Sequence, residues 1–310
     1  MEAVTGLVGR ELELSEALAA LRAGNSLVVK GRAGIGKTAL LRQLHRLLKD
    51  ELPCFWLADT NAKAAVFDLA EQVHRRLSLQ VPERLIPERY RARAHQTGLV
   101  EWAWIKRSLS RAPMRETADL LLASLRGRGA IVFLEALEVA PTQAELYHDL
   151  AEVAQLAAAM DEDNRRVRIQ RLLWRFQKTL ELKPLTRSQS KALVECWQEH
   201  RPIRFSSDRV RQAFVRAVVQ DSGGVPAAIA GMLQAAGNDG EVTPASIRAY
   251  RHEAGTRYLD MTPALVLLVI GFMAMRYVSR GIGQVELLVM SGVGSALFYG
   301  LSIFLRRLGR

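Results

Sequence analysis

Residues 31–38, which read GRAGIGKT, carry the clearest chemistry in this chain of 310 residues. They match the pattern G-x-x-x-x-G-K-[ST] in full. Glycines in such a loop adopt backbone conformations closed to other residues, so that backbone amides can surround phosphate groups. Lys37 is expected to reach the β- and γ-phosphates, and the Thr38 hydroxyl to ligate Mg²⁺. These residues therefore predict a site for ATP or a related nucleoside triphosphate, with Mg²⁺ as the second cofactor.

The segments on either side of this loop have the order that phosphate binding requires. SLVVKG, which ends at Gly31, is a short apolar run rich in β-branched residues and is expected to be a buried strand. ALLRQLHRLLKDEL follows and has the spacing of an amphipathic helix. A helix that begins at Lys37 directs its N-terminal amides and the positive end of its dipole at the same phosphates. This context favours a true phosphate site over a chance match.

Completion of a magnesium site requires a second acidic group at the end of a neighbouring strand. Residues 130–135, AIVFLE, are expected to be a buried strand that ends at Glu135. Such a carboxylate holds Mg²⁺ through water and helps to position the attacking water. Ala136 follows where many hydrolysing proteins carry a second acid, and Glu138 is the nearest substitute. The alternative is that Glu135 is an ordinary surface acid at a strand end.

Alternation of strands and helices up to about residue 183 predicts the fold class. CFWLAD, after Pro53, is a further expected strand, and a last strand is expected in TLELKPL before Pro184. Helices are expected over residues 64–79 and 141–160, with a helical insertion over residues 80–128. The residues after 160 could form a short strand at 167–170 or one basic helix. This order is typical of an α/β fold with a parallel sheet flanked by helices.

From Thr186 to about Gly255 the apolar spacing is helical, with breaks at SGGVP (222–226) and GNDG (237–240). We expect a small helical domain there.

Four segments, taken together, resemble one protein family. LVGRELEL (7–14) resembles the VGRExEL motif of STAND and ORC/Cdc6-like AAA+ ATPases, and GRAGIGKTALLRQL resembles their P-loop. TLELKPLTRSQSKALVECW is similar to the strand and turn that lead into their helical lid, and SGGVPAAI (222–229) resembles the lid's GGxPxAI segment. The resemblance covers residues 4–236 and implies a P-loop NTPase core, a lid and ATP binding.

The resemblance extends the set of site residues. It implies that the VGRExEL segment lies near the nucleotide base and that the lid proline lies close to the nucleotide. Catalytic roles fall to Lys37 and Glu135, and the Mg²⁺ ligands are Thr38 and Glu135. The nucleotide-binding residues predicted from the loop and the resemblance are Val8, Gly9, Arg10, Gly31, Arg32, Ala33, Gly34, Ile35, Gly36, Lys37, Thr38, Ala39 and Pro226.

The sequence also departs from the family pattern. No strand ends in a polar residue at the place of the first sensor, and Gln170 and Arg171 are the nearest candidates. Arg171 or Arg175, before Phe176, could serve as an arginine finger in a ring, but a solvated basic face is the favoured interpretation. No arginine directly follows the two glycines of the lid motif. The pattern therefore favours nucleotide binding more strongly than fast hydrolysis.

Two uncharged runs near the end of the chain predict a membrane anchor. Residues 261–275 carry no charge, and residues 287–305 carry none over 19 residues. A helix of about 20 apolar residues spans a bilayer core, and Arg276 can extend its charged head to the interface of the shorter run. Gly292, Ala296 and Gly300 form a small-residue ridge that lets another helix approach closely. The alternative is a buried apolar hairpin, although little chain remains to cover it.

Basic residues predict the orientation of these two spans. They flank the pair, with only two in the connecting loop: Arg248, Arg251 and Arg257 come before, Arg276 and Arg280 between, and Arg306, Arg307 and Arg310 after. The positive-inside rule then places the N-terminal domain in the cytoplasm. We therefore expect a multi-pass protein of the cell (inner) membrane with the lipid bilayer as a partner.

The overall charge and the cysteines limit the remaining partners. A formal net charge of +11 favours an anionic partner, which is nucleotide, nucleic acid or an anionic membrane surface. The basic stretches 84–128 and 165–187 contain Trp102, Trp104 and Trp174; we favour lipid contact or simple solvation over nucleic acid, and core packing for the tryptophans. The two cysteines, Cys54 and Cys196, are expected to be buried free thiols in a reducing compartment.

These observations combine into one hypothesis with three rivals. We expect a P-loop ATPase core over residues 1–185, a helical lid over 186–256 and a two-helix anchor over 257–310. The function predicted is ATP-driven conformational switching with self-association or a protein partner. The rivals are a nucleotide-gated switch or scaffold that does not hydrolyse ATP, a DNA-binding AAA+ protein, and a small-molecule P-loop kinase, in which the lid and the anchor have no role.

Overall fold

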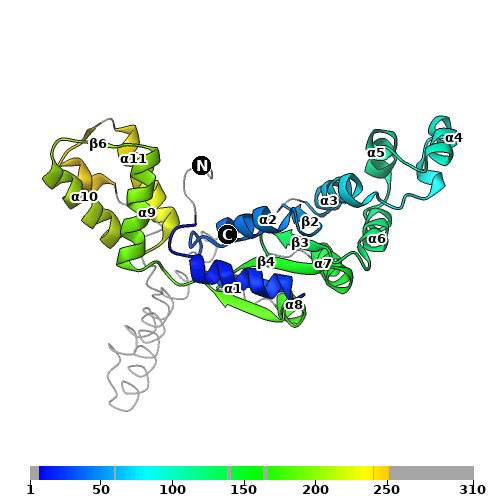
Figure 1. The fold of residues 1–310 in the computed structure, drawn as a ribbon, viewed down its shortest axis with the longest axis horizontal. Coiled ribbons are helices and arrows are strands. Elements are labelled where there is room, and N and C mark those ends of the chain that lie inside the picture. Colours follow the sequence, from blue (N-terminus) through cyan, green and yellow to red (C-terminus); the bar gives the residue numbers. More distant parts are fainter. Residues whose placement is uncertain (1–6, 59–60, 138–140, 163–166, 240, 251–310) are drawn as a thin grey trace, which may run out of the picture. The chain divides into compact units, whose positions relative to one another are not determined.

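The structure, a computed structural model, describes residues 7–250 apart from 59–60, 138–140, 163–166 and 240. Its centre is a sheet of five strands in the order β2-β3-β4-β1-β5, in which every pairing is parallel (Figure 1). The strands are β1 (Leu27–Gly31), β2 (Cys54–Leu57), β3 (Ile131–Leu134), β4 (Gln155–Asp161) and β5 (Lys178–Glu181). The predicted parallel α/β sheet is thereby confirmed.

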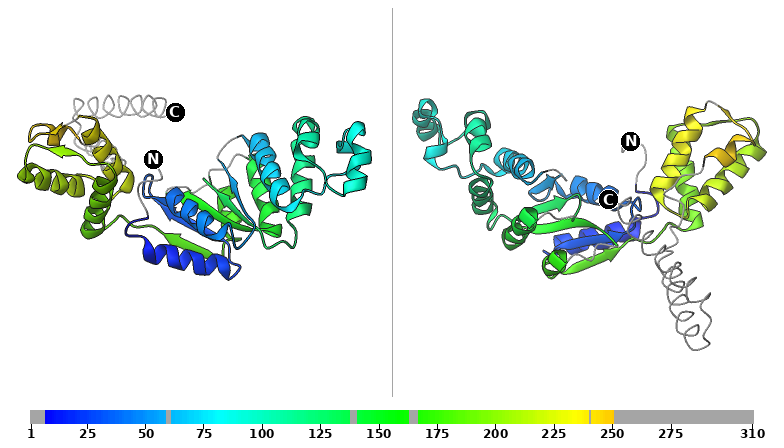
Figure 2. Two further views of the ribbon diagram at one scale, coloured as in Figure 1. Left: turned by 45° about the horizontal axis from the view of Figure 1, so that its top comes forward. Right: turned by 180° about the vertical axis from the view of Figure 1, so that it is seen from behind.

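Helices cover both faces of this sheet (Figures 1 and 2). In chain order the helices of this part are α1 (Glu11–Arg22), α2 (Lys37–Leu48), α3 (Ala62–Leu77), η1 (Glu83–Leu85), α4 (Glu88–Thr97), α5 (Trp102–Arg111), α6 (Met114–Leu125), α7 (Pro141–Val153) and α8 (Val167–Leu173). The helical insertion predicted for residues 80–128 is therefore present as η1 and α4 to α6.

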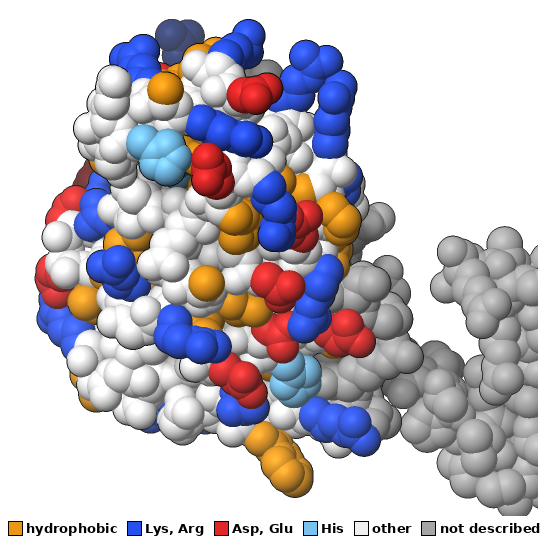
Figure 3. All heavy atoms as spheres, turned by 90° about the vertical axis from the view of Figure 1, so that its right-hand side faces the viewer, with side chains coloured by type: hydrophobic (Ala, Val, Ile, Leu, Met, Phe, Trp, Pro, Cys, Tyr) orange, Lys and Arg blue, Asp and Glu red, His pale blue; other side chains and the backbone are white. Residues whose placement is uncertain are grey.

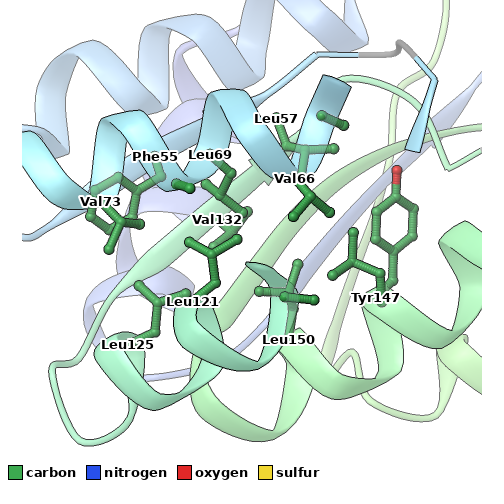
Figure 4. Packing of buried hydrophobic residues seen from close by; sticks show 14 of the residues in the cluster. Phe55, Leu57, Val66, Leu69, Val73, Leu121, Leu125, Val132, Tyr147 and Leu150 are labelled. Atoms are coloured by element: carbon green, nitrogen blue, oxygen red, sulfur yellow. The ribbon is translucent and has the colours of Figure 1, made fainter. Parts of the chain in front are cut away.

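Alternate side chains of the strands enter two separate hydrophobic cores, because successive residues of a strand point to opposite faces. Ile131 and Phe133 of β3 pack with α1 and α2 on one face, whereas Val132 and Leu134 pack with α3, α6 and α7 on the other. Figure 4 shows the second core from close by, with side chains of α3, α6 and α7 directed at those of β2 and β3. Strands buried on both faces explain why these segments are continuously apolar rather than alternating.

Strand β4 differs from the sequence prediction. The helix expected over residues 141–160 ends at Val153, and QLAAAMD forms a strand between β3 and β1. Alanine favours helices, but this run fills the centre of the sheet, where small side chains are buried on both faces. Tertiary packing therefore overrides the local helical preference. The segment after it forms helix α8, so the alternative of a strand at 167–170 is wrong.

Residues 185–250 build a separate hydrophobic cluster, which we refer to as the lid. Its helices are α9 (Arg187–His200), α10 (Asp208–Asp221), α11 (Pro226–Asn238) and η2 (Ser246–Ala249). Phe214, Ile229 and Leu233 lie at its centre and are fully buried. The sequence predicted a wholly helical lid. The structure differs, since β6 (Arg204–Phe205) and β7 (Glu241–Val242) form a short parallel pair.

The expected membrane spans lie outside the described residues. Within the part of the chain that the structure describes, no helix is both long enough and apolar enough to cross a bilayer.

Candidate functional site

Three chain segments end at one edge of the sheet and form the base of the candidate site. Gly31, the last residue of β1, is in register with Asp161, the last residue of β4. Glu135 directly follows β3, whose Leu134 pairs with Ala158 of β4. Ligands of open α/β sheets bind at the carboxyl ends of the strands. The glycine loop and two carboxylates therefore meet where a ligand is expected.

The glycine loop owes its shape to residues that only glycine accommodates well. Gly36 is the N-cap of α2 and has φ 102°, a left-handed conformation that side chains disfavour. Gly34 has φ 74°, and a Cβ atom there would lie 2.8 Å from the Cβ of Ala227 in α11. The backbone amide of Ala227 donates a hydrogen bond to the Gly34 carbonyl, at 3.1 Å. The loop thus contacts the lid directly.

The ammonium group of Lys37 is fully engaged by protein acceptors. It donates to the carbonyl oxygens of Gly31 at 2.9 Å and Arg32 at 2.8 Å, and to Oδ1 of Asp161 at 2.6 Å. An ammonium group has three N–H donors. All three are therefore satisfied by the protein, with one of them in an ion pair.

Glu135 is also engaged, but by a residue that the sequence analysis did not consider. Nη2 of Arg42, one helical turn beyond Thr38 in α2, lies 3.1 Å from Oε1 of Glu135. The guanidinium also lies 5.7 Å from the ring centroid of Trp56 in β2, in a cation–π arrangement. Contacts on two sides fix Arg42 beside the carboxylate.

A third ion pair joins the same two parts of the molecule. Nε of Arg32, in the glycine loop, lies 3.8 Å from Oε2 of Glu162, the residue after β4. Together with Lys37–Asp161 and Arg42–Glu135, it links the loop and α2 to the ends of β3 and β4. Positive groups of the phosphate region are thus neutralised by carboxylates of the sheet edge.

A cavity of about 360 Å³ lies against the loop and is shared with the lid. This volume is within the range of small-molecule sites, which is about 300–1,000 Å³. One wall is the polar start of α2, including Lys37, Thr38 and Arg42. The other wall is apolar and consists of Leu7, Leu193, Trp197, Pro226, Ala227, Ile229, Ala230 and Leu233. A ligand with one anionic and one apolar end matches this division.

Some of the predicted nucleotide-binding residues line this cavity, and others lie close by. Those that line it are Gly34, Gly36, Lys37, Thr38, Ala39 and Pro226. Arg32 and Ala33 are exposed, Ile35 is buried and Gly31 lies below the loop as the end of β1. Glu135 does not line the cavity, but it forms an ion pair with Arg42, which does.

The three residues predicted from the VGRExEL segment make structural contacts beside the cavity, where Leu7 is the lining residue. Val8 packs on the lid cluster, and the carbonyl of Gly9 accepts a hydrogen bond from Nε2 of Gln189 at 2.9 Å. The buried Arg10 pairs with Glu13 at 2.7 Å and donates to the carbonyl of Lys183 at 2.5 Å. These contacts hold the start of the chain against the connection between core and lid.

The site residues that were not predicted from the sequence include Asp161, Arg42, Leu193 and Trp197. Asp161 was missed because its strand was interpreted as helix, which also led to the wrong conclusion that no strand ends in a polar residue. The available signal was the acidic cluster DEDN directly after a short apolar run. Arg42 has the helical spacing from Thr38 that would have indicated a shared face.

The residues suggested as sensor or arginine finger lie elsewhere. Gln170 and Arg171 are on α8, and both are exposed. Arg175 forms an ion pair with Glu152 at 3.0 Å. Trp174, next to it, is 91% exposed, contrary to the expected core position, whereas Trp104 is buried as expected. Tryptophan and arginine are enriched at the energetic centres of protein interfaces.

The basic insertion carries charges of both signs. Figure 3, which faces the side where α4 lies in Figure 1, shows Lys and Arg side chains interspersed with Asp and Glu. Arg84 pairs with Glu116 at 2.7 Å, and Arg115 with Asp149 at 3.3 Å. This mixture favours a simply solvated face over a continuous basic groove that binds a polyanion.

The chemistry of the site suits Mg²⁺. Hard divalent cations prefer oxygen ligands, and Thr38 offers a hydroxyl while Glu135 offers a carboxylate directly after β3. Elsewhere in the described residues, Cys196, Glu199 and His200 bring ligand atoms within 4.8 Å of one another in the last turn of α9. Such proximity follows from the spacing of a helix alone.

Cys196 is half-buried rather than buried, while burial raises the pKa of the Cys54 thiol to about 11.

Comparison with known proteins identifies the fold. No protein-family model matches the sequence, and no curated protein matches it significantly. Among solved structures, the ORC1 protein of Aeropyrum pernix in complex with DNA is similar with a TM-score of 0.53 and 18% identity, over 86% of this chain and 72% of that one. At this level of identity the similarity shows that the chain shares the fold of that protein.

Two other solved structures from Thermotoga maritima are similar at a lower level. RuvB, a Holliday junction branch migration motor, has a TM-score of 0.45 and 12% identity, over 89% of this chain and 82% of that one. Domain III of the replication initiation protein DnaA has a TM-score of 0.45 and 17% identity, over 80% of this chain and 93% of that one.

Proposed function

We propose that this chain binds ATP with Mg²⁺ between its glycine loop and its lid and acts as an AAA+/STAND-type ATPase. The observation that carries the proposal is the cavity shared by the start of α2 and by Trp197 and Pro226 of the lid. The triphosphate would lie against Lys37 and Thr38, and the base against the apolar lid wall. Because the ligand touches both parts, its binding couples loop and lid, which is the basis for a nucleotide-driven switch.

Within this proposal the residues have separate tasks. Lys37 and the amides at the start of α2 hold the phosphates, and Thr38 and Glu135 would hold Mg²⁺. The bound cation would neutralise the charge that develops on the phosphates. Glu135 would also orient the attacking water once Arg42 releases it.

We further propose that residues 257–310 anchor the protein in the cell membrane with the ATPase domain on the cytoplasmic side, and that protomers self-associate. The support for the anchor is the pair of uncharged runs and the arginines around them. The support for self-association is the exposed Trp174 beside Arg175. Flotation of the full-length chain with lipid vesicles after a carbonate wash tests the anchor, and its recovery in the soluble fraction contradicts it.

Binding of a fluorescent ATP analogue to the full-length protein in detergent tests the core of the proposal. Lys37→Ala should weaken binding by at least about tenfold, since removal of a charge-assisted hydrogen bond costs roughly 1.5–3 kcal/mol. Arg107→Ala, which removes an exposed charge from α5, is the matched control and should bind like the unchanged protein. Equal affinity of Lys37→Ala and the unchanged protein would reject the assignment.

A switch that hydrolyses ATP slowly or not at all is the second candidate, favoured by the pairing of Glu135 with Arg42 and by Ala136. Comparison of ATP turnover by Glu135→Gln and by the unchanged protein separates the two functions. A rate that falls at least about tenfold in the variant supports an enzyme. A negligible and equal rate in both, with nucleotide still bound, supports the switch.

DNA binding is a further alternative, motivated by the basic charge and by the similar ORC1 structure, which was solved in complex with DNA. Fluorescence anisotropy with labelled duplex DNA across salt concentrations tests it, because phosphate contacts make affinity fall steeply with salt. Absence of binding at low salt excludes this alternative.

A further inference from the structure

Lys37 has no hydrogen left to donate to a phosphate. Its three acceptors are two carbonyls of the loop and the Asp161 carboxylate, at 2.9, 2.8 and 2.6 Å. An ammonium group offers three donors, so a phosphate can bind it only if one acceptor leaves. The loop carbonyls belong to the same turn as Lys37, whereas Asp161 lies on another strand.

Electrostatics selects Asp161 as the acceptor that leaves. A carboxylate and a phosphate are both anions, and two anions on one ammonium group repel each other. A carbonyl carries no net charge and is not repelled in this way. The Asp161 side chain is 44% exposed while that of Lys37 is 11% exposed, so water can receive the released carboxylate. Replacement of Asp161 by phosphate is thus the exchange with the lowest electrostatic cost.

We infer that Asp161 is an internal competitor for the phosphate site, which sets the affinity of the protein for nucleotides. The inference rests on the proposed function, because it concerns the same site. Asp161 takes the place on Lys37 that a phosphate of the ligand would need. Nucleotide binding exchanges one anion for the other and releases the end of β4 from Lys37. The Arg32–Glu162 ion pair, at 3.8 Å, joins the glycine loop to the same strand end.

This role makes the effect of Asp161 depend on the phosphates of the ligand. The lysine of such a loop reaches the β- and γ-phosphates. ATP must therefore displace Asp161, whereas AMP, which has neither phosphate, leaves the ion pair intact. Loss of the competitor should raise the affinity for ATP and leave the affinity for AMP unchanged.

The test uses the full-length protein and a fluorescent ATP analogue, with AMP measured by competition. Asp161→Asn keeps the shape of the side chain but removes its charge, and it should tighten ATP binding about fivefold and change AMP binding less than about twofold. Asp161→Ala should act in the same direction and serves as a second variant. The matched control is Glu181→Gln, which removes an exposed carboxylate at the end of β5, on the other side of β1 from Asp161, and should leave ATP affinity unchanged.

A double-mutant cycle shows whether Asp161 acts through Lys37. In a Lys37→Met background, Asp161→Asn should no longer tighten ATP binding, because the group for which Asp161 competes is absent. Tightening of the same size in both backgrounds, or for AMP as well as ATP, would mean a general charge effect and overturn the inference. Unchanged or weaker ATP binding by both Asp161 variants would overturn it too. Absence of binding by every protein, the unchanged chain included, rejects the proposed function itself.

Discussion

Trp197 and Leu193 give the candidate site its apolar wall at the scale of single residues. Their side chains are 4% and 9% exposed, and they lie one turn apart on α9. The guanidinium of Arg201 lies 5.6 Å from the centroid of the Trp197 ring in a cation–π arrangement. As a residue that lines the cavity, Trp197 offers a base apolar contact area.

Trp197→Ala should therefore weaken binding of the ATP analogue about tenfold or more, because the loss of one stacked base costs roughly 1–3 kcal/mol. Equilibrium titration of the full-length protein measures the change. Trp174→Ala is the control, since this tryptophan is 91% exposed and does not line the cavity. If both variants bind as the unchanged protein does, the base does not rest on the lid wall.

At the scale of elements, helix α2 has two tasks that depend on different faces. Its first turn carries the phosphate site, and Leu40, Leu41, Leu44 and Leu48 anchor the helix in the core. His45 lies between these faces, with its ring edge-on to Phe133 of β3 at 5.3 Å and to Trp56 of β2 at 5.9 Å. Burial, and then the charge of Lys49, lower the pKa of His45 below its usual value.

This packing predicts an acid sensitivity of the fold. A histidine whose pKa is lowered in the folded state binds its proton more readily after unfolding, so stability is lost as pH falls below its ordinary pKa of 6.5. Between about pH 7.5 and about pH 5.5, the free energy of unfolding of His45→Gln should decrease less than that of the unchanged protein. Urea denaturation at several pH values measures this. His74, whose pKa burial also lowers, contributes equally to both proteins.

At the scale of the whole molecule, one surface has the features of a protomer contact. Trp174 projects from the end of α8, and Arg175 follows it in an ion pair with Glu152 on α7. Tryptophan and arginine dominate the energetic centres of interfaces because they combine large area with hydrogen bonding. Neither residue lines the cavity, so in the proposed assembly Arg175 would act on the nucleotide of another protomer.

If protomers act together in this way, ATP turnover per protomer should rise with protein concentration. Arg175→Ala should remove most of this rise, so that turnover per protomer at high protein concentration falls at least about tenfold. This is the effect expected for an arginine that stabilises the charge of the transition state. Hydrolysis assays across a concentration series, with sedimentation velocity on the same samples, provide the measurement. A turnover that is independent of concentration in the unchanged protein contradicts assembly through this surface.

What the sequence alone determined is local. The loop at residues 31–38, its strand and its helix follow from neighbouring residues, because glycine conformations, an apolar run and a helical repeat are properties of short segments. The break before Pro226 could be predicted for the same reason, since proline is favoured in the first turn of a helix.

Only the tertiary structure decided which charges meet at this loop. Lys37 and Asp161 are separated by 124 positions and come together because β1 and β4 pair in parallel with Gly31 opposite Asp161. Arg42 and Glu135 are 93 positions apart and meet because α2 packs on the sheet above the end of β3. The alanine-rich β4 has no strong strand preference of its own, and its position in the sheet is set by burial on both faces. Strand order and register therefore create the ion pairs that the sequence alone could not place.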